Sequence, residues 1–277
     1  MYTGTAIQRR SEPTMSDIRS NRRRTVLRSM SLVLASSVAG CMSLLGDNSD
    51  GSIPEQTPAI NEATESTVAS PNGAAPYMQP ASGTTDYGVA LDNSPVMGSN
   101  DAPIDMYYWS DYLCPFCSKF TLNIHPEITS TFVAEGSLRV VFLQLPNIGP
   151  NSLPAALLSK CVWNQVVDND PNRFWTWHRT IFERQGEENS GWADIENLLT
   201  ITDSAGFDTD PLRDCIQNRQ DSIKEEIQAE IDTADQAHIK RTPAFVFVNY
   251  NTDTTRKITG TQPYNAFEST VQAMKND

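Results

Sequence analysis

Apolar residues recur after residue 100 either with a period of two or in short unbroken runs. Every second residue from 104 to 108 is apolar or aromatic, which is typical of a strand. Residues 138–145 and 244–249 are more continuously apolar, as expected for strands covered on both faces of a sheet. Residues 257–260 predict the hairpin partner of the last strand. The pattern therefore predicts several strands of one sheet.

Helical periods fill most of the remaining chain. The predicted helices cover residues 118–136, 151–167, 173–184, 192–204, 211–237 and 263–274. The fifth of these is long enough that we expect a break within it. The order of strand, helix, strand, helices, two strands and helix predicts an α/β fold with a block of helices in its middle.

A polar stretch precedes this pattern. Residues 41–85 are rich in Ser, Thr, Pro, Asn, Gly and acidic residues, and they show no lasting period. Such a segment buries too little apolar surface to offset the entropy of ordering it, so we expect a disordered tether. Residues 86–277 suit a single domain with a sizeable core. The helical block would occupy about residues 150–237.

The first residues resemble a targeting segment. Two arginines at 23–24 precede a short apolar run at residues 30–39 and then Cys41. This resembles a twin-arginine export signal joined to a lipoprotein cleavage site, since the run is far below the roughly 20 residues that span a bilayer. Cleavage would remove residues 1–40 and leave Cys41 lipid-modified. Met15 is an alternative start to the first residue.

Charge limits the partners. The formal net charge is −13, and residues 1–40 contain seven arginines and two acidic residues. The remainder thus has 14 basic and 32 acidic residues, a net charge of −18. Such acidity argues against nucleic acid or an anionic membrane surface as a partner. It favours a protein from a very salty environment, in which self-repulsion is screened, and a haloarchaeal source; an ordinary acidic secreted domain is the alternative.

Cys114 and Cys117 carry the chemistry. A disulfide is transferred by thiolate attack through a mixed disulfide, which a second thiol nearby resolves. If Cys114 opens a helix, the positive helix end stabilises its thiolate and lowers its pKa, and we expect that thiol to be exposed. Cys117 would lie one turn further, shielded, as the resolving thiol.

A Cys-x-x-Cys pair is also half of a zinc site. Structural zinc usually requires a second pair of Cys or His ligands at comparable spacing. Cys161 and Cys215 are isolated in the sequence, and the histidines are scattered, so a redox dithiol is favoured over a metal site. Once Cys41, Cys114 and Cys117 have roles, two cysteines are left. In an exported protein this even number predicts a structural disulfide between Cys161 and Cys215. The alternative is two free buried cysteines.

Five separated motifs occur together. They are Asp101-Ala-Pro-Ile, Ser110-Asp-Tyr-Leu-Cys-Pro-Phe-Cys, Phe174-Trp-Thr-Trp-His, Arg241-Thr-Pro-Ala-Phe and Gly260-Thr-Gln-Pro-Tyr. In this order, from about residue 87 to the end, they resemble the DsbA-like thioredoxin-fold family of thiol-disulfide oxidoreductases. The resemblance implies a thioredoxin-like fold with a helical insertion between the first βαβ unit and the C-terminal ββα unit.

The resemblance also implies roles for single residues. Cys114 would be the nucleophile, Cys117 the resolving thiol, and Pro243 a cis-proline facing them. Thr242 would offer backbone groups to an extended substrate, and Pro115 and Phe116 would border the same groove. Without the resemblance, an ordinary trans-proline at the start of a strand is the simpler interpretation of Pro243.

Two positions depart from the family pattern. Many relatives have a carboxylate six residues before the first catalytic cysteine, where this chain has Tyr108. The strongly oxidising relatives have a histidine between the cysteines, where this chain has Phe116. We expect Asp111 to stabilise a turn or a cap, and we expect neither His125 nor His178 to be catalytic.

These observations predict an exported, membrane-tethered thiol-disulfide oxidoreductase that acts on exported protein thiols as a monomeric disulfide donor. No cofactor beyond the Cys114/Cys117 couple and no metal is expected, and an unidentified redox partner would reset the couple. A reductase or isomerase of exported disulfides stays open as an alternative. So does a lipoprotein that binds copper or zinc with the same two sulfurs.

Overall fold

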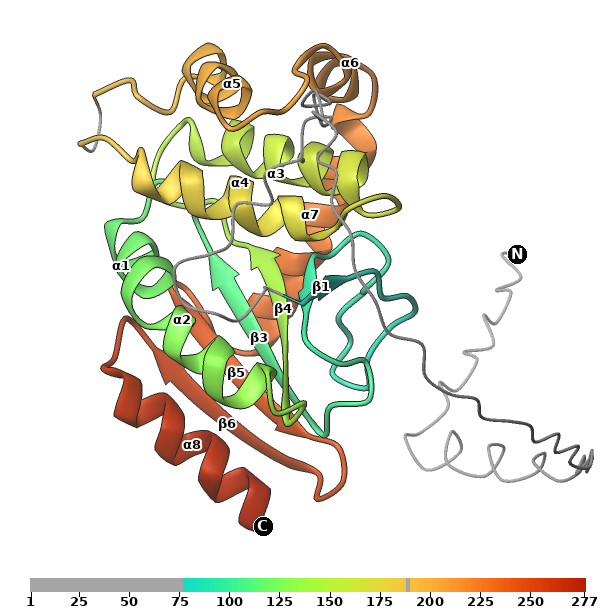
Figure 1. Cartoon of the computed structure of the whole chain (residues 1–277), viewed down its shortest axis with the longest axis vertical. Coiled ribbons are helices and arrows are strands. Elements are labelled where there is room, and N and C mark those ends of the chain that lie inside the picture. Colours follow the sequence, from blue (N-terminus) through green and yellow to red (C-terminus); the bar gives the residue numbers. More distant parts are fainter. Residues whose placement is uncertain (1–76, 188–189) are drawn as a thin grey trace, which may run out of the picture. The chain divides into compact units, whose positions relative to one another are not determined.

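Six strands form one mixed sheet in the order β1-β2-β4-β3-β5-β6 (Figure 1). Their bounds are β1 Met78–Gln79, β2 Val96–Met97, β3 Ile104–Ser110, β4 Leu138–Gln144, β5 Ala244–Asn249 and β6 Thr254–Thr259. β3 and β4 pair in parallel, and the other neighbouring strands pair antiparallel. This computed structural model describes residues 77–187 and 190–277. Cys41, the predicted signal peptide and most of the predicted tether lie outside these residues.

The central strands are buried on both faces, as their apolar sequences predict. All residues of β3 and β5 are buried. Along β3, Met106 and Tyr108 pack into a large core on one face, whereas Tyr107 and Trp109 pack into a smaller core on the other. This alternation follows from the period of two along a strand. It fixes which side chains of β3 reach the helix that follows it.

Eight α-helices and a π-helical turn are found in the described residues. Their bounds are α1 Pro115–Asn123, α2 His125–Ile128, the π-helical turn η1 Thr129–Val133, α3 Ser152–Val166, α4 Asn172–Glu183, α5 Ile195–Ser204, α6 Asp210–Asn218, α7 Gln220–Gln236 and α8 Tyr264–Asn276. Helices α3 to α7 form the predicted block between β4 and β5. Much of the block lies at one end of the sheet, next to α1 (Figure 1). The part of the chain that the structure describes has no helix both long and apolar enough to span a membrane.

The prediction of a mixed α/β thioredoxin-like fold with a helical insertion is confirmed, but two local predictions are wrong. The helix predicted over residues 118–136 is three shorter pieces, because the chain leaves α1 at Ile124 and Pro126 opens the next helix. In addition, the sheet begins inside the stretch predicted as tether. Met78 is 4% exposed, pairs with Met97 and donates its N–H to the Asn172 side chain over 2.9 Å.

A buried ion pair joins the block to the sheet. The Lys160 ammonium of α3 contacts the Glu230 carboxylate of α7. The same carboxylate accepts the backbone N–H of Gln144 at the end of β4 over 2.7 Å, and the ammonium donates to the carbonyl of Asn93 over 2.8 Å. Both charges thus have further hydrogen-bond partners, which buried ions need. The contact holds α3, α7 and β4 in a fixed arrangement.

Candidate active site

The turn between β3 and α1 carries the two cysteines. Cys114 takes the N-cap position of α1, with Pro115 in the first turn. The Asp111 carboxylate shapes this turn, because it accepts the N–H of Leu113 over 2.9 Å. Its second oxygen accepts the N–H of Ile148 over 3.0 Å and that of the preceding residue over 2.8 Å. Asp111 therefore joins the cysteine turn to the loop that follows β4.

Cys114 lies where a thiolate is stabilised. Its Sγ donates to the carbonyl of Thr242 over 3.4 Å. The pKa of Cys114 is lowered from 9.0 to about 6, mainly by a hydrogen bond from the Cys117 thiol. Thr242 and the backbone N–H groups of Phe116 and Cys117 lower the pKa further, and burial opposes them. At neutral pH most of the Cys114 sulfur is therefore a thiolate.

Cys117 lies in a different setting one turn into α1. It is fully buried, and burial, followed by the neighbouring Cys114, raises its pKa well above 9.0. The prediction that Cys114 is exposed is wrong for this reduced form, because Cys114 is only 2% exposed. The carbonyl of Thr242 lies against it on one side. The thiols consequently differ more in their hydrogen bonds than in their exposure.

Hydroxyl groups lie where the family resemblance would place a carboxylate. Ser110 bonds its hydroxyl to that of Tyr108 over 3.0 Å, and Tyr108 lies 3.4 Å from the hydroxyl of Thr121. Both the Ser110 and the Tyr108 hydroxyls are hydrogen-bond partners of Cys117, and Ser110 lowers the pKa of that thiol. These neutral hydroxyl groups can donate or accept a hydrogen bond beside the buried sulfur of Cys117.

Thr242 and Pro243 face the cysteines from the start of β5. The peptide bond between them is cis. The Pro243 carbonyl accepts the N–H of Gly260 over 2.8 Å, which connects this turn to the end of β6. Cys114 and Thr242 are 128 residues apart in the sequence and meet only because β3 and β5 are neighbours.

Gln185, which the sequence analysis did not single out, holds the turn from the other side. Its side-chain amide donates to the carbonyl of Tyr112 over 2.7 Å and to that of Cys114 over 3.2 Å. Next to it, the Ser118 hydroxyl donates to the carbonyl of Phe182 over 3.2 Å. The end of α4 is thereby bound to the first turn of α1. A single glutamine about 70 residues away carries no local sequence signal that could have revealed this contact.

Tyr112 of the cysteine turn packs into a buried cluster of aromatic residues. The Tyr112 hydroxyl lies 2.9 Å from that of Ser159 and 2.8 Å from Nδ1 of His178. Burial lowers the pKa of His178 to about 3, and it lowers the pKa of His125 to about 3 as well. Both imidazoles are therefore neutral at ordinary pH, and His178 contacts Tyr112 rather than a sulfur. This agrees with a packing role for the two histidines.

The residues between the cysteines face outward. Phe116 is 61% exposed, and Pro115 is exposed beside it. The Thr261 hydroxyl donates to the carbonyl of Phe116 over 2.6 Å, so the loop after β6 borders this surface. Ile148, tied to the cysteine turn through Asp111, is 44% exposed. Two large apolar side chains are thus available to a partner near Cys114.

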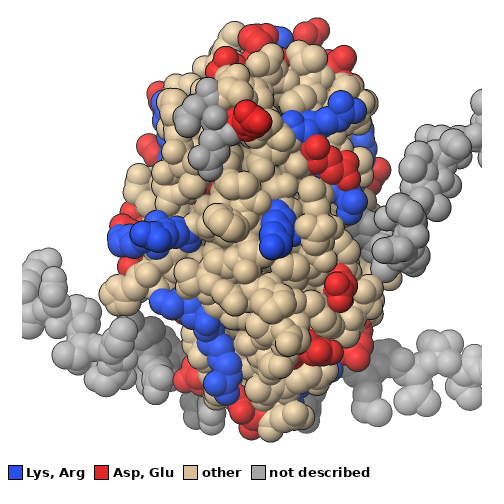
Figure 2. All heavy atoms as spheres, turned by 90° about the vertical axis from the view of Figure 1, so that its left-hand side faces the viewer, with Lys and Arg blue, Asp and Glu red and all other residues tan. Residues whose placement is uncertain are grey.

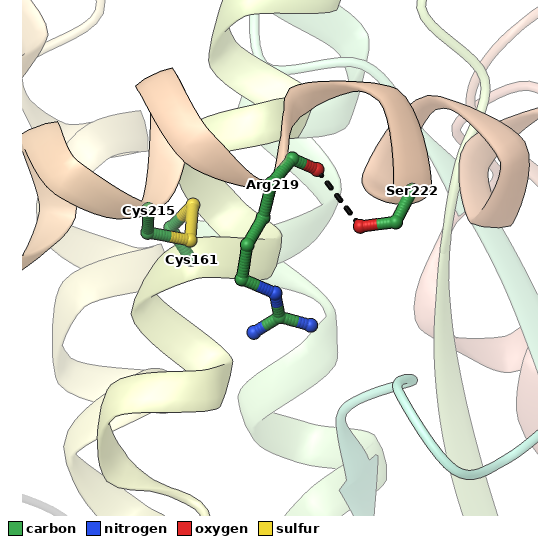
Figure 3. The surroundings of a disulfide bond; sticks show 4 residues. All are labelled: Cys161, Cys215, Arg219 and Ser222. Carbon is green, nitrogen blue, oxygen red and sulfur yellow. Dashed lines mark hydrogen bonds between the residues drawn. A yellow bond between two sulfur atoms is a disulfide. The ribbon is translucent and has the colours of Figure 1, made fainter.

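The second pair of cysteines is bonded. Cys161 of α3 and Cys215 of α6 form a disulfide of 2.07 Å, with 54 residues of sequence separation (Figure 3). Cys114 and Cys117 are free thiols. In the described residues no group of three or more His, Cys, Asp or Glu side chains is arranged to hold a metal ion. The structure thus separates one reduced pair at the end of β3 from one bonded pair inside the helical block.

Comparison with known proteins shows which family has this fold. A family model described as Thioredoxin matches residues 90–272. The chain belongs to the thioredoxin family. Its matched region includes the cysteine turn, the helical block and the turn at Pro243. The block is therefore an insertion within a thioredoxin-family domain rather than a separate module.

Relatives refine this placement. Disulfide bond formation protein D of Bacillus subtilis is 27% identical over 161 residues, which cover 58% of this chain and 69% of the relative. The crystal structure of oxidised BdbD from the same organism has a TM-score of 0.58 at 24% identity, covering 72% of this chain and 100% of that one. Chlamydia trachomatis DsbA has a TM-score of 0.57 at 20% identity, covering 71% and 98%. The predicted DsbA-like thiol-disulfide oxidoreductase class is confirmed, with a cysteine couple as its redox group.

Proposed function

We propose that this protein donates the Cys114–Cys117 disulfide to cysteine pairs of other exported proteins. The observation that carries the proposal is the position of Cys114 at the N-terminal end of α1, where the Cys117 thiol and the backbone N–H groups of Phe116 and Cys117 help to lower its pKa to about 6. A stabilised thiolate favours the reduced form of the pair. The oxidised form then tends to pass its disulfide to ordinary thiols. The relationship to disulfide bond formation proteins supports the same direction.

The transfer takes two exchange steps. A substrate thiolate attacks Sγ of Cys114, the bond between the two cysteines breaks, and Cys117 leaves as a thiolate that takes up a proton. A second substrate thiolate then attacks the substrate sulfur of the mixed disulfide, and Cys114 leaves as its stabilised thiolate. Two electrons move from substrate to protein, and the substrate gains one disulfide. A redox partner that accepts two electrons must then reoxidise the pair.

The surface around Cys114 and Thr242 suits an extended substrate. The backbone of Thr242 faces Cys114 and is available to pair with a strand-like segment, which gives broad specificity. Pro115 and Phe116, both exposed, would lie along the same segment. Ser110 and Tyr108 would hydrogen-bond the Cys117 sulfur as it leaves.

The N-terminal sequence supports a location outside the cytoplasm. We place a twin-arginine lipoprotein signal at residues 1–40, lipid attachment at Cys41, and a polar tether that ends near residue 77, where the sheet begins. Two acyl chains would anchor the protein stably. The excess of acidic residues supports a salt-rich surrounding. The protein would act there as a monomer at the outer face of the membrane.

The reduction potential of the Cys114/Cys117 couple tests the proposal. It is measured by equilibration with glutathione or dithiothreitol in high salt, with Cys161 and Cys215 monitored separately. A pKa of about 6 lies between those of thioredoxin and DsbA, so we expect a potential between roughly −270 mV and roughly −120 mV. A value at or below that of thioredoxin would indicate a reductase. Absence of a reversible couple would exclude thiol-disulfide exchange.

A further inference from the structure

Most basic side chains of the described residues have a carboxylate or carbonyl partner, but a few have none. These few form no ion pair and no side-chain hydrogen bond with another described residue, and they are Lys119, Arg184, Arg219 and Arg241. All four are exposed. The chain has 34 acidic and 21 basic residues, so carboxylates are plentiful on its surface. In a protein with this excess of carboxylates, it needs an explanation that four exposed cations have no carboxylate partner.

Two of these cations flank the first turn of α1. Lys119 lies three residues after Phe116, a spacing that places both side chains on one face of the helix. Arg184 directly precedes Gln185, whose amide holds the carbonyl of Cys114 over 3.2 Å. The backbone segments that carry both positive charges are thereby held next to the cysteine turn by the contact between α1 and the end of α4.

Arg241 lies on the second segment that contacts Cys114. It directly precedes Thr242, whose carbonyl lies 3.4 Å from Sγ of Cys114. The neighbouring carbonyl of Lys240 accepts the Asn147 side chain over 3.2 Å, which brings in the loop that carries Ile148. We name Lys119, Arg184 and Arg241 the basic rim. Phe116 and Ile148 are exposed large apolar side chains on the segments that carry or contact the rim.

Figure 2 shows the side of the molecule that carries α1. Uncharged residues cover much of its middle, with basic side chains among and beside them and acidic ones mainly towards the edges. The lowered pKa of Cys114 comes mainly from hydrogen bonds of Cys117, Thr242 and backbone N–H groups. The rim charges are thus available to a molecule that docks on this surface.

The net charge decides what the rim can do. A strongly acidic protein repels acidic polypeptides at long range, which lowers their rate of encounter. Three cations on the segments around Cys114 oppose that repulsion locally over about a Debye length, which is close to 10 Å at 0.1 M salt. That range covers two or three residues on either side of a cysteine bound at Cys114, since an extended chain spans about 3.3 Å per residue.

We propose that the basic rim selects extended polypeptide segments in which acidic residues flank the reacting cysteine, while Phe116 and Ile148 take an apolar side chain of the same segment. This rests on the proposed function and names its substrate class. Basic segments would be excluded by the same charges. The selection acts when the segment binds, before any exchange of disulfides. It therefore applies both to peptide thiols that bind the oxidised protein and to peptide disulfides that bind the reduced protein.

Peptides of equal length provide the test. Each has one cysteine flanked by aspartate, by serine or by lysine, and stopped-flow measurements give its rate of reaction with the oxidised protein. Flanking charges also change the peptide's own thiol pKa, so each rate is divided by that peptide's rate with the neutral reagent hydroxyethyl disulfide. At low salt we expect the acidic peptide to react about tenfold faster than the basic one. In 1 M salt, where the Debye length is about 3 Å, we expect the ratio to fall but to stay above one, because only rim cations and peptide carboxylates in direct contact escape the screening.

The control is a variant at the fourth unpaired cation, matched in charge change to a single rim reversal such as Lys119→Glu, which should lower the ratio. Arg219 lies at the junction of α6 and α7, beside the Cys161–Cys215 disulfide and remote in sequence from the cysteine turn (Figure 3). Reversal of the whole rim in Lys119→Glu/Arg184→Glu/Arg241→Glu should abolish or invert the preference. Arg219→Glu should keep the wild-type ratio. The melting temperature and the alkylation midpoint of Cys114 show that the fold and the site of the triple variant are intact.

The outcomes separate two failures. Equal rates for all three peptides in the wild type, or an unchanged ratio in the triple variant, would overturn the selection by charge. Loss of the ratio in Arg219→Glu as well would mean that net charge, rather than the rim, steers the peptides. If no peptide exchanges at all, including the serine peptide, the proposed oxidoreductase function itself fails.

Discussion

Both cysteine pairs of this chain can form a disulfide, but only one of them is bonded in the structure. Cys114 and Cys117 are free thiols on one helix, whereas Cys161 and Cys215 are bonded across two helices. A bond across 54 residues removes about 4 kcal/mol of chain entropy from the unfolded state, whereas a bond across three removes less than about 2 kcal/mol. The first pair also has a stabilised thiolate, and the second has none. Loop length and thiolate environment together therefore separate a bond that is readily exchanged from one that stays closed.

The largest expected effect comes from removing one sulfur of the reactive pair. Cys114→Ser should reduce the rate of peptide oxidation to the uncatalysed level, because the sulfur that the substrate attacks, and that leaves in the second step, is lost. The double variant Cys161→Ala/Cys215→Ala is the matched control and should keep the exchange rate within a few-fold at a temperature where it is folded. Full activity of Cys114→Ser would mean that a different sulfur performs the exchange.

The next effect concerns stability. Cys161→Ala/Cys215→Ala should lower the free energy of unfolding by about 4 kcal/mol, because the bond closes a loop of 54 residues. Urea denaturation measures the change, and Cys114→Ala/Cys117→Ala serves as the comparison. If removal of either pair had the same small effect on unfolding, loop closure would not be the basis of the difference.

The smallest effect is the reactivity of Cys114 toward iodoacetamide. With a pKa of about 6, roughly nine-tenths of the thiol is ionised at pH 7, against about 1% for a pKa of 9. Lower pKa also lowers nucleophilicity, which offsets about twentyfold of that gain. We expect Cys114 to react only about fourfold faster than an ordinary thiol at pH 7, with a midpoint near pH 6. A midpoint near pH 9 would contradict the assigned environment.

Stability against pH provides the control for that titration. Because the pKa of Cys114 is depressed in the folded protein, the unfolded chain binds more protons between about pH 6 and 9. The stability of the reduced protein should therefore rise with pH across that window and be lost as pH falls toward 6. Cys114→Ser should lack this rise. The oxidised protein should lack it as well, since its sulfurs do not titrate.

The sequence predicted best those features that depend on near neighbours in the chain. β5 was predicted with the bounds that the structure has, because its apolar run is unbroken. The helix over 151–167 was predicted within one residue at each end. Cys114 and Cys117 were recognised because their spacing is itself the signal, and the resemblance to the family drew attention to Pro243. Local pattern and motif were sufficient for these.

Contacts between distant residues could not be predicted in the same way. Gln185 reads as an ordinary polar residue after a helix, and only the packing of α4 against α1 gives it a role. Lys160 and Glu230 occupy positions that resemble solvent-facing ones, although they form a buried pair. Met78 belongs to a two-residue strand, which is too short to show a period. Each of these depends on tertiary structure that the sequence pattern does not encode locally.

The order of the cysteines along the chain has a consequence for biosynthesis. Cys161 and Cys215 both lie between Cys114 and Thr242, which are 128 residues apart in the sequence. The segment between these two residues must fold before Cys114 meets Thr242, and the Cys161–Cys215 bond restrains that segment. In the proposed location this bond forms outside the cytoplasm, after the whole chain has been made. An oxidised copy of the enzyme already at the membrane, or another oxidant, can therefore close the bond of a newly exported copy.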